Sequence, residues 1–131
     1  MIVVDTNVIA YRFIAGDKTK PALRLEKYDA DWRVPYLWRY EYLNVLSTLT
    51  KNSIIKENQG IIIWQNTLGY LNGREYGVDA EKVLRISIHS GISAYDACYI
   101  ILAQSLNTKC ATSDNKLVRL FPERTLFLDD F

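Results

Sequence analysis

The stretch Ile2-Val3-Val4-Asp5-Thr6-Asn7 begins almost at the start of the 131-residue chain and decides how the remainder is interpreted. Three β-branched residues in a row predict a strand that is buried on both faces, which is typical of a parallel sheet. Asp5 and Thr6 are favourable at the start of a helix, so we expect the strand to end there and a helix to follow at once. A strand joined directly to a helix is the building unit of an α/β fold.

Short β-branched runs and longer helical stretches alternate along the rest of the chain, with no linker, repeat or low-complexity segment. This alternation predicts a single domain over residues 1–131, a three-layer α/β/α arrangement with a central parallel sheet. We expect strands at 2–5, 33–35, 76–78, 109–112 and 126–128. We expect helices at 6–14, 19–28, 36–51, 55–71, 80–90, 93–106 and 115–120.

The composition is that of a globular protein. Hydrophobic residues make up 49% of the chain, which is ample for a core at this length. The longest apolar runs are too short to span a membrane, and Met1 leads into a strand without the features of a signal peptide, so we expect a cytoplasmic protein. Cys98 and Cys110 have apolar neighbours and are predicted to be buried, reduced thiols, and a single histidine argues against a zinc site.

Four acidic residues are expected near one edge of the sheet: Asp5, Glu41, Asp96 and Asp114. Asp5 and Asp114 each follow a strand, and the carboxyl ends of parallel strands are where ligands usually bind. Carboxylates are suitable ligands for Mg²⁺, and one or two such ions can hydrolyse a phosphodiester without a protein nucleophile. We therefore predict that these four acids are catalytic and bind the metal.

Two of the acids also have a structural explanation. Asp5 could cap the following helix, and Asp96 stands third in a helix whose start, Ser93-Ala94-Tyr95-Asp96, resembles a capping box. Glu41 lies among apolar neighbours, which favours a functional role over an ordinary surface position. Short polar residues that could orient the acids, or simply form turns and caps, stand beside them: Thr6, Asn7, Asn44, Thr112 and Ser113.

Four segments together resemble the PIN-domain ribonucleases, in particular the VapC toxins of toxin–antitoxin pairs. The segments are Val4–Val8, Glu41–Leu46, Gly91–Ala97 and Thr112–Leu117, so the resemblance spans nearly the whole chain. It implies a PIN-like fold and an endoribonuclease that depends on Mg²⁺ or Mn²⁺ bound at an acidic pocket. Matched by motif, the acidic quartet is Asp5, Glu41, Asp96 and Asp114, with Thr112 as the hydroxyl residue two positions before the last acid.

The resemblance also implies two protein partners. One is a second copy of the chain in a homodimer, and the other is a small VapB-like antitoxin whose C-terminal segment occupies the pocket. Some members carry a further acid directly after the fourth, where this chain has Asn115 and Lys116, so the number of bound ions stays open. The RNA target stays open as well.

Other functions fit the sequence less well. A PIN-like module that only binds a partner would be free to lose an acid, whereas a housekeeping PIN nuclease without an antitoxin stays open as an alternative. A haloacid-dehalogenase-type enzyme needs an aspartate two residues after Asp5, where Asn7 stands, and a dinucleotide site needs a glycine-rich turn after the first strand. We expect His89 to be a structural or surface residue, and most of the aromatic side chains to lie in the core or a subunit interface.

Overall fold

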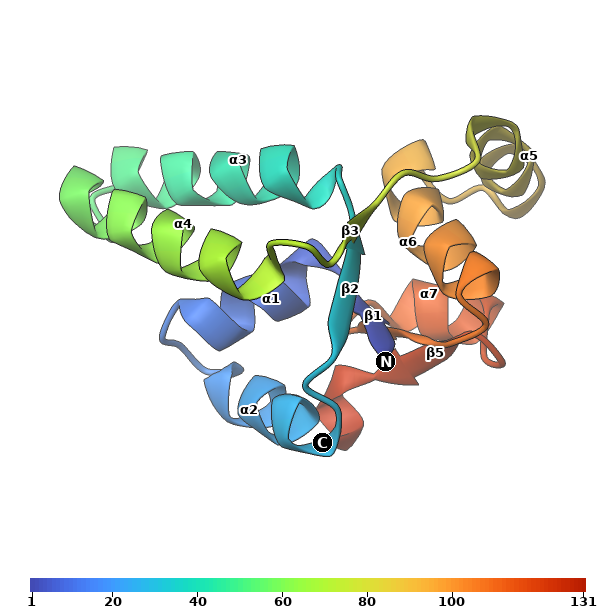
Figure 1. The fold of residues 1–131 in the computed structure, drawn as a ribbon, viewed down its shortest axis with the longest axis horizontal. Coiled ribbons are helices and arrows are strands. Elements are labelled where there is room, and N and C mark those ends of the chain that lie inside the picture. The colour runs from blue at the N-terminus through green and yellow to red at the C-terminus, as the bar shows by residue number, and fades with distance from the viewer.

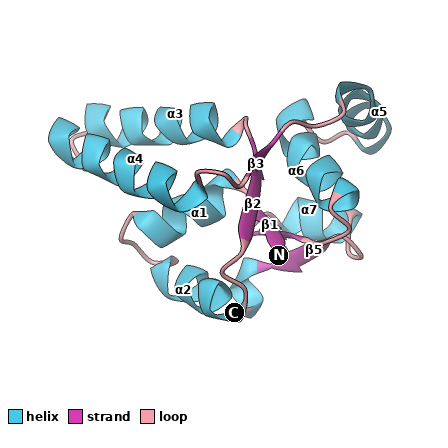
Figure 2. Ribbon diagram, in the orientation of Figure 1, coloured by secondary structure: helices cyan, strands magenta, loops and turns pink.

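The computed structural model describes all residues, Met1–Phe131, as one parallel sheet with helices on both of its faces. In Figure 1, α1 to α4 cover one side of the sheet and α5 to α7 cover the other. Figure 2 shows the same three layers, with the strands between two groups of helices. The predicted three-layer α/β/α arrangement is confirmed.

The five strands are β1 (Ile2–Val4), β2 (Trp32–Pro35), β3 (Glu75–Tyr76), β4 (Cys110–Thr112) and β5 (Thr125–Phe127). The helices are α1 (Thr6–Phe13), α2 (Thr19–Tyr28), α3 (Trp38–Lys51), α4 (Glu57–Leu71), α5 (Ala80–Ser90), α6 (Ala94–Ser105) and α7 (Asn115–Leu120). All strand pairs are parallel, in the order β3-β2-β1-β4-β5. The first strand is therefore central, and the chain builds the sheet outward from it in both directions.

The structure corrects the sequence prediction at a few element ends. The helix expected from Tyr36 begins at Trp38, and the one expected from Ile55 begins at Glu57. The last strand ends at Phe127, because the fully buried Leu128 begins a short 3₁₀ helix, η1 (Leu128–Asp130), which the sequence did not predict. Such shifts of one or two residues are usual where a first or last turn is irregular.

The core has two parts, one on each face of the sheet. Side chains alternate along a strand, so Val4 belongs to the cluster beneath α1 to α4 and Val3 to the cluster beneath α5 to α7. Both valines are fully buried, as predicted for a central strand. Both cysteines are free thiols, with Cys110 buried and Cys98 partly buried. No single helix is long and apolar enough to cross a membrane, and only α5 and α6 together reach that length and composition, across a bend of 117°.

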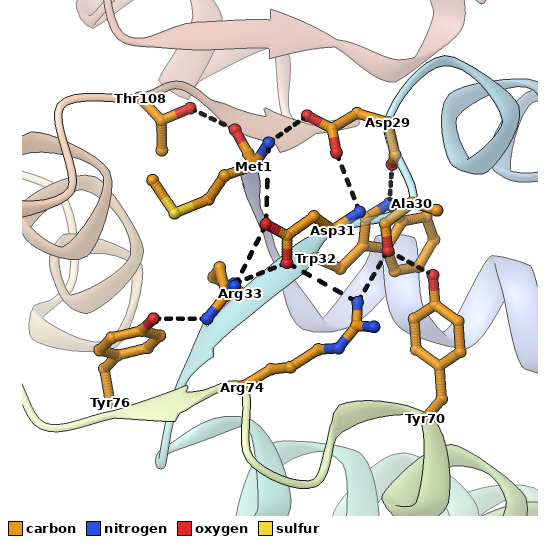
Figure 3. A network of polar contacts seen from close by, with 10 residues as sticks. All are labelled: Met1, Asp29, Ala30, Asp31, Trp32, Arg33, Tyr70, Arg74, Tyr76 and Thr108. Atoms are coloured by element: carbon orange, nitrogen blue, oxygen red, sulfur yellow. Dashed lines mark hydrogen bonds and ion pairs between the residues drawn. The ribbon is translucent and has the colours of Figure 1, made fainter.

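The amino ends of the strands carry a network of paired charges (Figure 3). The amino group of Met1 lies 2.7 Å from Asp29 Oδ2, and Arg33 Nε donates to Asp31 Oδ1 over 2.7 Å. Arg74 lies 3.8 Å from the same Asp31 oxygen. The Arg33 side chain, mainly through its hydrogen bond, lowers the pKa of Asp31 below its usual value. At this edge of the sheet, each aspartate thus has a basic partner.

Candidate active site

A cavity of about 260 Å³ lies where the carboxyl end of β1 meets α1, α3 and α6. This is the position at which strand order reverses, since β2 lies on one side of β1 and β4 on the other. Ligands of open parallel sheets bind at such crevices. The lining contains three carboxylates and no basic side chain: Asp5, Thr6, Asn7, Glu41, Asn44, Val45, Asp96 and Tyr99.

Asp5 leaves β1 and caps α1, and both of its carboxylate oxygens have partners. Its Oδ1 accepts a hydrogen bond from the backbone N–H of Val8 at 2.9 Å, and its Oδ2 accepts one from the hydroxyl of Thr112 at 2.5 Å. The side chain is buried, and this burial raises the pKa of Asp5 to about 6 despite the two hydrogen bonds. The charges of Asp96 and Glu41 raise this pKa further. The capping and the functional explanations of Asp5 are therefore compatible.

Thr112 connects the first predicted acid to the last one. Its hydroxyl donates to Asp5 and accepts from the backbone N–H of Asp114 at 3.0 Å, which fixes the direction of the hydroxyl proton. Asp114 caps α7 through Oδ1, which accepts from the backbone N–H of Lys116 at 2.8 Å. Asp114 does not line the cavity, but it lies close enough to raise the pKa of Asp96.

Glu41 reaches the cavity because the first turn of α3 is anchored to β3. The nearly buried Glu75 carboxylate accepts from Trp38 Nε1 at 2.8 Å and from Arg39 Nε at 2.6 Å. The hydrogen bond from Arg39 is the main reason that the pKa of Glu75 is lowered. Trp38 also stacks on Trp64 of α4, with ring centroids 5.4 Å apart. These contacts hold the helix on which Glu41 is the fourth residue.

Two hydroxyl groups contact Glu41 within the cavity. Thr6 Oγ1 lies 3.0 Å from Glu41 Oε1, and the hydroxyl of Tyr99 lies 2.6 Å from the same oxygen. The two hydroxyls are 2.5 Å from each other. Burial, and then the neighbouring charge of Glu41, raises the pKa of Tyr99 well above its ordinary value, so the phenol stays protonated and can donate.

Asp96 enters the cavity from the first turn of α6. Its backbone N–H donates to the hydroxyl of Ser93 at 3.0 Å, so the predicted cap of this helix is present. Burial raises the pKa of Asp96, and the charges of Asp114 and Glu41 act in the same direction. The aspartate therefore stands among like charges that make its ionised form costly.

The structure brings most of the predicted polar residues to the cavity, but not all of them. Asn7 and Asn44 line it, Thr6 contacts Glu41, and Thr112 contacts Asp5, whereas Ser113 is absent from the lining. Tyr99 was not among the residues predicted for the site from the sequence. Its position three residues after Asp96 was the available signal, because residues three apart share one face of a helix.

The donor set suits a divalent cation, since carboxylate and amide oxygens are the hard ligands that Mg²⁺ and Mn²⁺ prefer. No three acidic, histidine or cysteine side chains lie close enough together to ligate one ion by themselves. Of the four acids predicted to bind metal, Asp5, Glu41 and Asp96 line the cavity and Asp114 lies outside its lining. The cavity fits an ion that binds one or two carboxylates and keeps several waters, as Mg²⁺ commonly does.

Comparison with known proteins gives the family. The sequence profile of the PIN domain matches residues 2–120. Ribonuclease VapC3 from Pyrobaculum aerophilum is 23% identical over 124 residues, which cover 92% of this chain and 95% of that protein.

Solved structures share the fold. The crystal structure of PAE2754 from Pyrobaculum aerophilum has a TM-score of 0.77 at 18% identity, covering 98% of this chain and 91% of that one. A toxin–antitoxin complex from Klebsiella pneumoniae contains a chain with a TM-score of 0.68 at 15% identity, covering 98% of each chain.

Proposed function

The chain belongs to the PIN-domain family, and on that premise we propose that it is a metal-dependent endoribonuclease that hydrolyses RNA phosphodiester bonds. The observation that carries the proposal is the cavity in which Asp5, Glu41 and Asp96 meet without a basic side chain in the lining. The relative named Ribonuclease VapC3 supports the same activity. We extend the proposal to residues 1–131 as one domain that acts on RNA in the cytoplasm.

In this proposal Asp5 and Asp96 hold the cation, since a positive charge would relieve the burial and like-charge repulsion that raise both pKa values. Glu41 and Asp114 complete the acidic quartet, and Thr112 orients Asp5 through its hydroxyl. When bound, Mg²⁺ or Mn²⁺ supplies the Lewis acidity that polarises the phosphate and activates the attacking water. Asn7 and Asn44 offer amide groups to the same space, where they can bind the substrate or a water.

The test is cleavage of RNA by the purified protein with Mn²⁺, with Mg²⁺ and with excess EDTA. We expect cleavage only with metal. Asp5→Asn should lower the cleavage rate by at least about a hundredfold, because removing a residue that merely orients a metal ligand already costs up to about that much. Asp79→Asn is the matched control, because Asp79 caps α5 as Asp5 caps α1 but does not line the cavity. Asparagine is itself a good cap, so both variants should fold.

Two results would contradict the proposed function. Hydrolysis that continues in excess chelator would overturn the metal-dependent mechanism. Metal and RNA binding without any cleavage, in a protein whose fold is intact, would instead indicate a PIN-like binding module.

We also propose that the chain is the toxin of a toxin–antitoxin pair, inhibited by a small VapB-like protein. The structural likeness to a chain from a Klebsiella pneumoniae toxin–antitoxin complex supports this role. Expression of the chain alone should arrest growth, and co-expression of the product of a short neighbouring reading frame should restore it. Growth that is unaffected by an active nuclease would favour a housekeeping PIN enzyme.

A homodimer is part of the same proposal. Leu84 and Ile88, one turn apart on α5, are 59% and 68% exposed, and apolar side chains grouped on one helix face favour burial against another subunit. Light scattering should give twice the chain mass, and Ile88→Glu should shift the protein toward the monomer. A monomer at all concentrations would remove this part of the proposal.

A further inference from the structure

Three oxygens from three helices meet beside the cavity: the hydroxyl of Thr6 in α1, a carboxylate oxygen of Glu41 in α3 and the hydroxyl of Tyr99 in α6. We infer that Tyr99 is a positioning residue for the proposed ribonuclease. Together with Thr6, it holds Oε1 of Glu41 and leaves Oε2 as the oxygen that Glu41 offers to a ligand. This inference rests on the proposed function of the same cavity.

The number of available protons determines how the three groups can pair. Two hydroxyls supply two protons, whereas the three oxygens make three contacts, so at most two contacts can be hydrogen bonds at one time. An ionised glutamate only accepts, and at least one proton must therefore point to Oε1 of Glu41. Either hydroxyl can also donate to the other. In every such arrangement at least one hydroxyl donates to Oε1, and Oε2 has no hydrogen-bond partner within the chain.

Core packing alone does not explain the hydroxyl of Tyr99. The side chain is only 2% exposed and belongs to the apolar cluster beneath α5 to α7, where a phenylalanine would pack as well. A buried hydroxyl is costly unless it is hydrogen-bonded. Both partners of this hydroxyl, Thr6 and Glu41, line the cavity. The free-energy cost of burying this hydroxyl is thus offset only by its contacts with Thr6 and Glu41, within the candidate site.

The experiment compares Tyr99→Phe with a matched control, Tyr42→Phe. Tyr42 is also fully buried and its hydroxyl lies 2.9 Å from that of Thr67, but it does not line the cavity. Mn²⁺ affinity is measured by electron paramagnetic resonance without RNA, and kcat and KM are measured on an RNA that the wild type cleaves. We expect Tyr99→Phe to weaken Mn²⁺ binding and to lower kcat, each by about tenfold, with KM little changed. Tyr42→Phe should leave all three values near those of the wild type.

A double-mutant cycle in metal-free urea unfolding tests the contact itself. If Tyr99 holds Glu41, the shift in the urea midpoint caused by Tyr99→Phe should change clearly when Glu41→Ala is already present. The same cycle between Tyr42→Phe and Glu41→Ala should show a clearly smaller coupling, because the hydroxyl of Tyr42 contacts Thr67 and not Glu41. Additive effects for Tyr99 and Glu41 would overturn the inference, whatever the protein does to RNA.

The two readouts separate this inference from the proposed function. If Tyr99→Phe binds Mn²⁺ as tightly as the wild type does, the inference about Tyr99 is also overturned. A wild-type protein that neither binds Mn²⁺ nor cleaves RNA would overturn the proposed function, and the unfolding cycle would then decide alone whether Tyr99 positions Glu41.

Discussion

Asp31 and Asp5 lie at opposite edges of the same sheet, and their surroundings shift their carboxyl pKa values in opposite directions. Asp31 is half-exposed and contacts Arg33 and Arg74, so its pKa is lowered (Figure 3). Asp5 is buried and its nearest charges are other acids, so its pKa is raised to about 6. The edge with Asp31, here called the paired edge because its acids contact basic groups, has the electrostatics of a structural network. At the edge with Asp5, here called the unpaired edge, the acids have no basic partner, and their ionisation carries an energetic cost that a bound cation can remove.

The largest expected effect comes from neutralising a second acid at the unpaired edge. Asp96→Asn should reduce RNA cleavage by more than about a hundredfold, since a group proposed to hold the cation is lost. The metal-free protein should be at least as stable as the wild type at pH 7, because the ionised side chain is disfavoured in the fold. Cleavage assays and thermal melting without metal measure the two effects. A clear drop in melting temperature would instead assign Asp96 a capping role in α6.

The next effect is a pH dependence of stability that arises at Asp5. Its pKa rises from 3.8 to about 6 on folding, so the unfolded chain releases this proton first as the pH increases. The free energy of unfolding should therefore fall between about pH 4 and pH 6, by up to about 3 kcal/mol from this group. Urea unfolding in metal-free buffer across this range should show the fall in the wild type and a weaker one in Asp5→Asn. Equal pH profiles would show that burial does not perturb this carboxyl group.

The smallest effect is expected at the paired edge. Asp31→Asn should cost no more than about 1 kcal/mol at pH 7, because partly exposed ion pairs contribute little. The pKa of Asp31 is lowered in the fold, so its contribution is present above the unfolded value of 3.8 and is lost as the pH falls below it. RNA cleavage should be unchanged. If Asp31→Asn impaired cleavage without unfolding the protein, the separation between the two edges would be wrong.

Features that depend on neighbouring residues could be predicted from the sequence. The β-branched run before Asp5 indicated a buried central strand, and the helix cap at Ser93 is present as expected. Asp5, Glu41 and Asp96 were expected at one edge of the sheet, and the structure brings them to one cavity. Their assignment as catalytic residues remains a prediction.

Features that depend on contacts between distant elements could not be predicted. Tyr99 contacts Thr6 and Glu41, which precede it by 93 and 58 positions in the sequence. No local sequence pattern predicts a contact between residues so far apart. Glu75 lies just before the strand expected at 76–78 and was assigned no role from the sequence, yet it anchors α3 through Trp38 and Arg39. The position of Asp114 outside the cavity lining likewise depends on how its side chain caps α7.

The bond between Thr112 and Asp5 also has a consequence for protein synthesis. Asp5 is made early, but the hydroxyl that fixes its carboxylate is made 107 positions later, a delay of roughly 5–20 seconds at the usual rates of translation. The nascent polypeptide carries Asp5, Glu41 and Asp96 before β4 can pair with β1. The acidic cavity is therefore completed only when the chain is almost fully translated, and a chain that stops before β4 lacks a finished site.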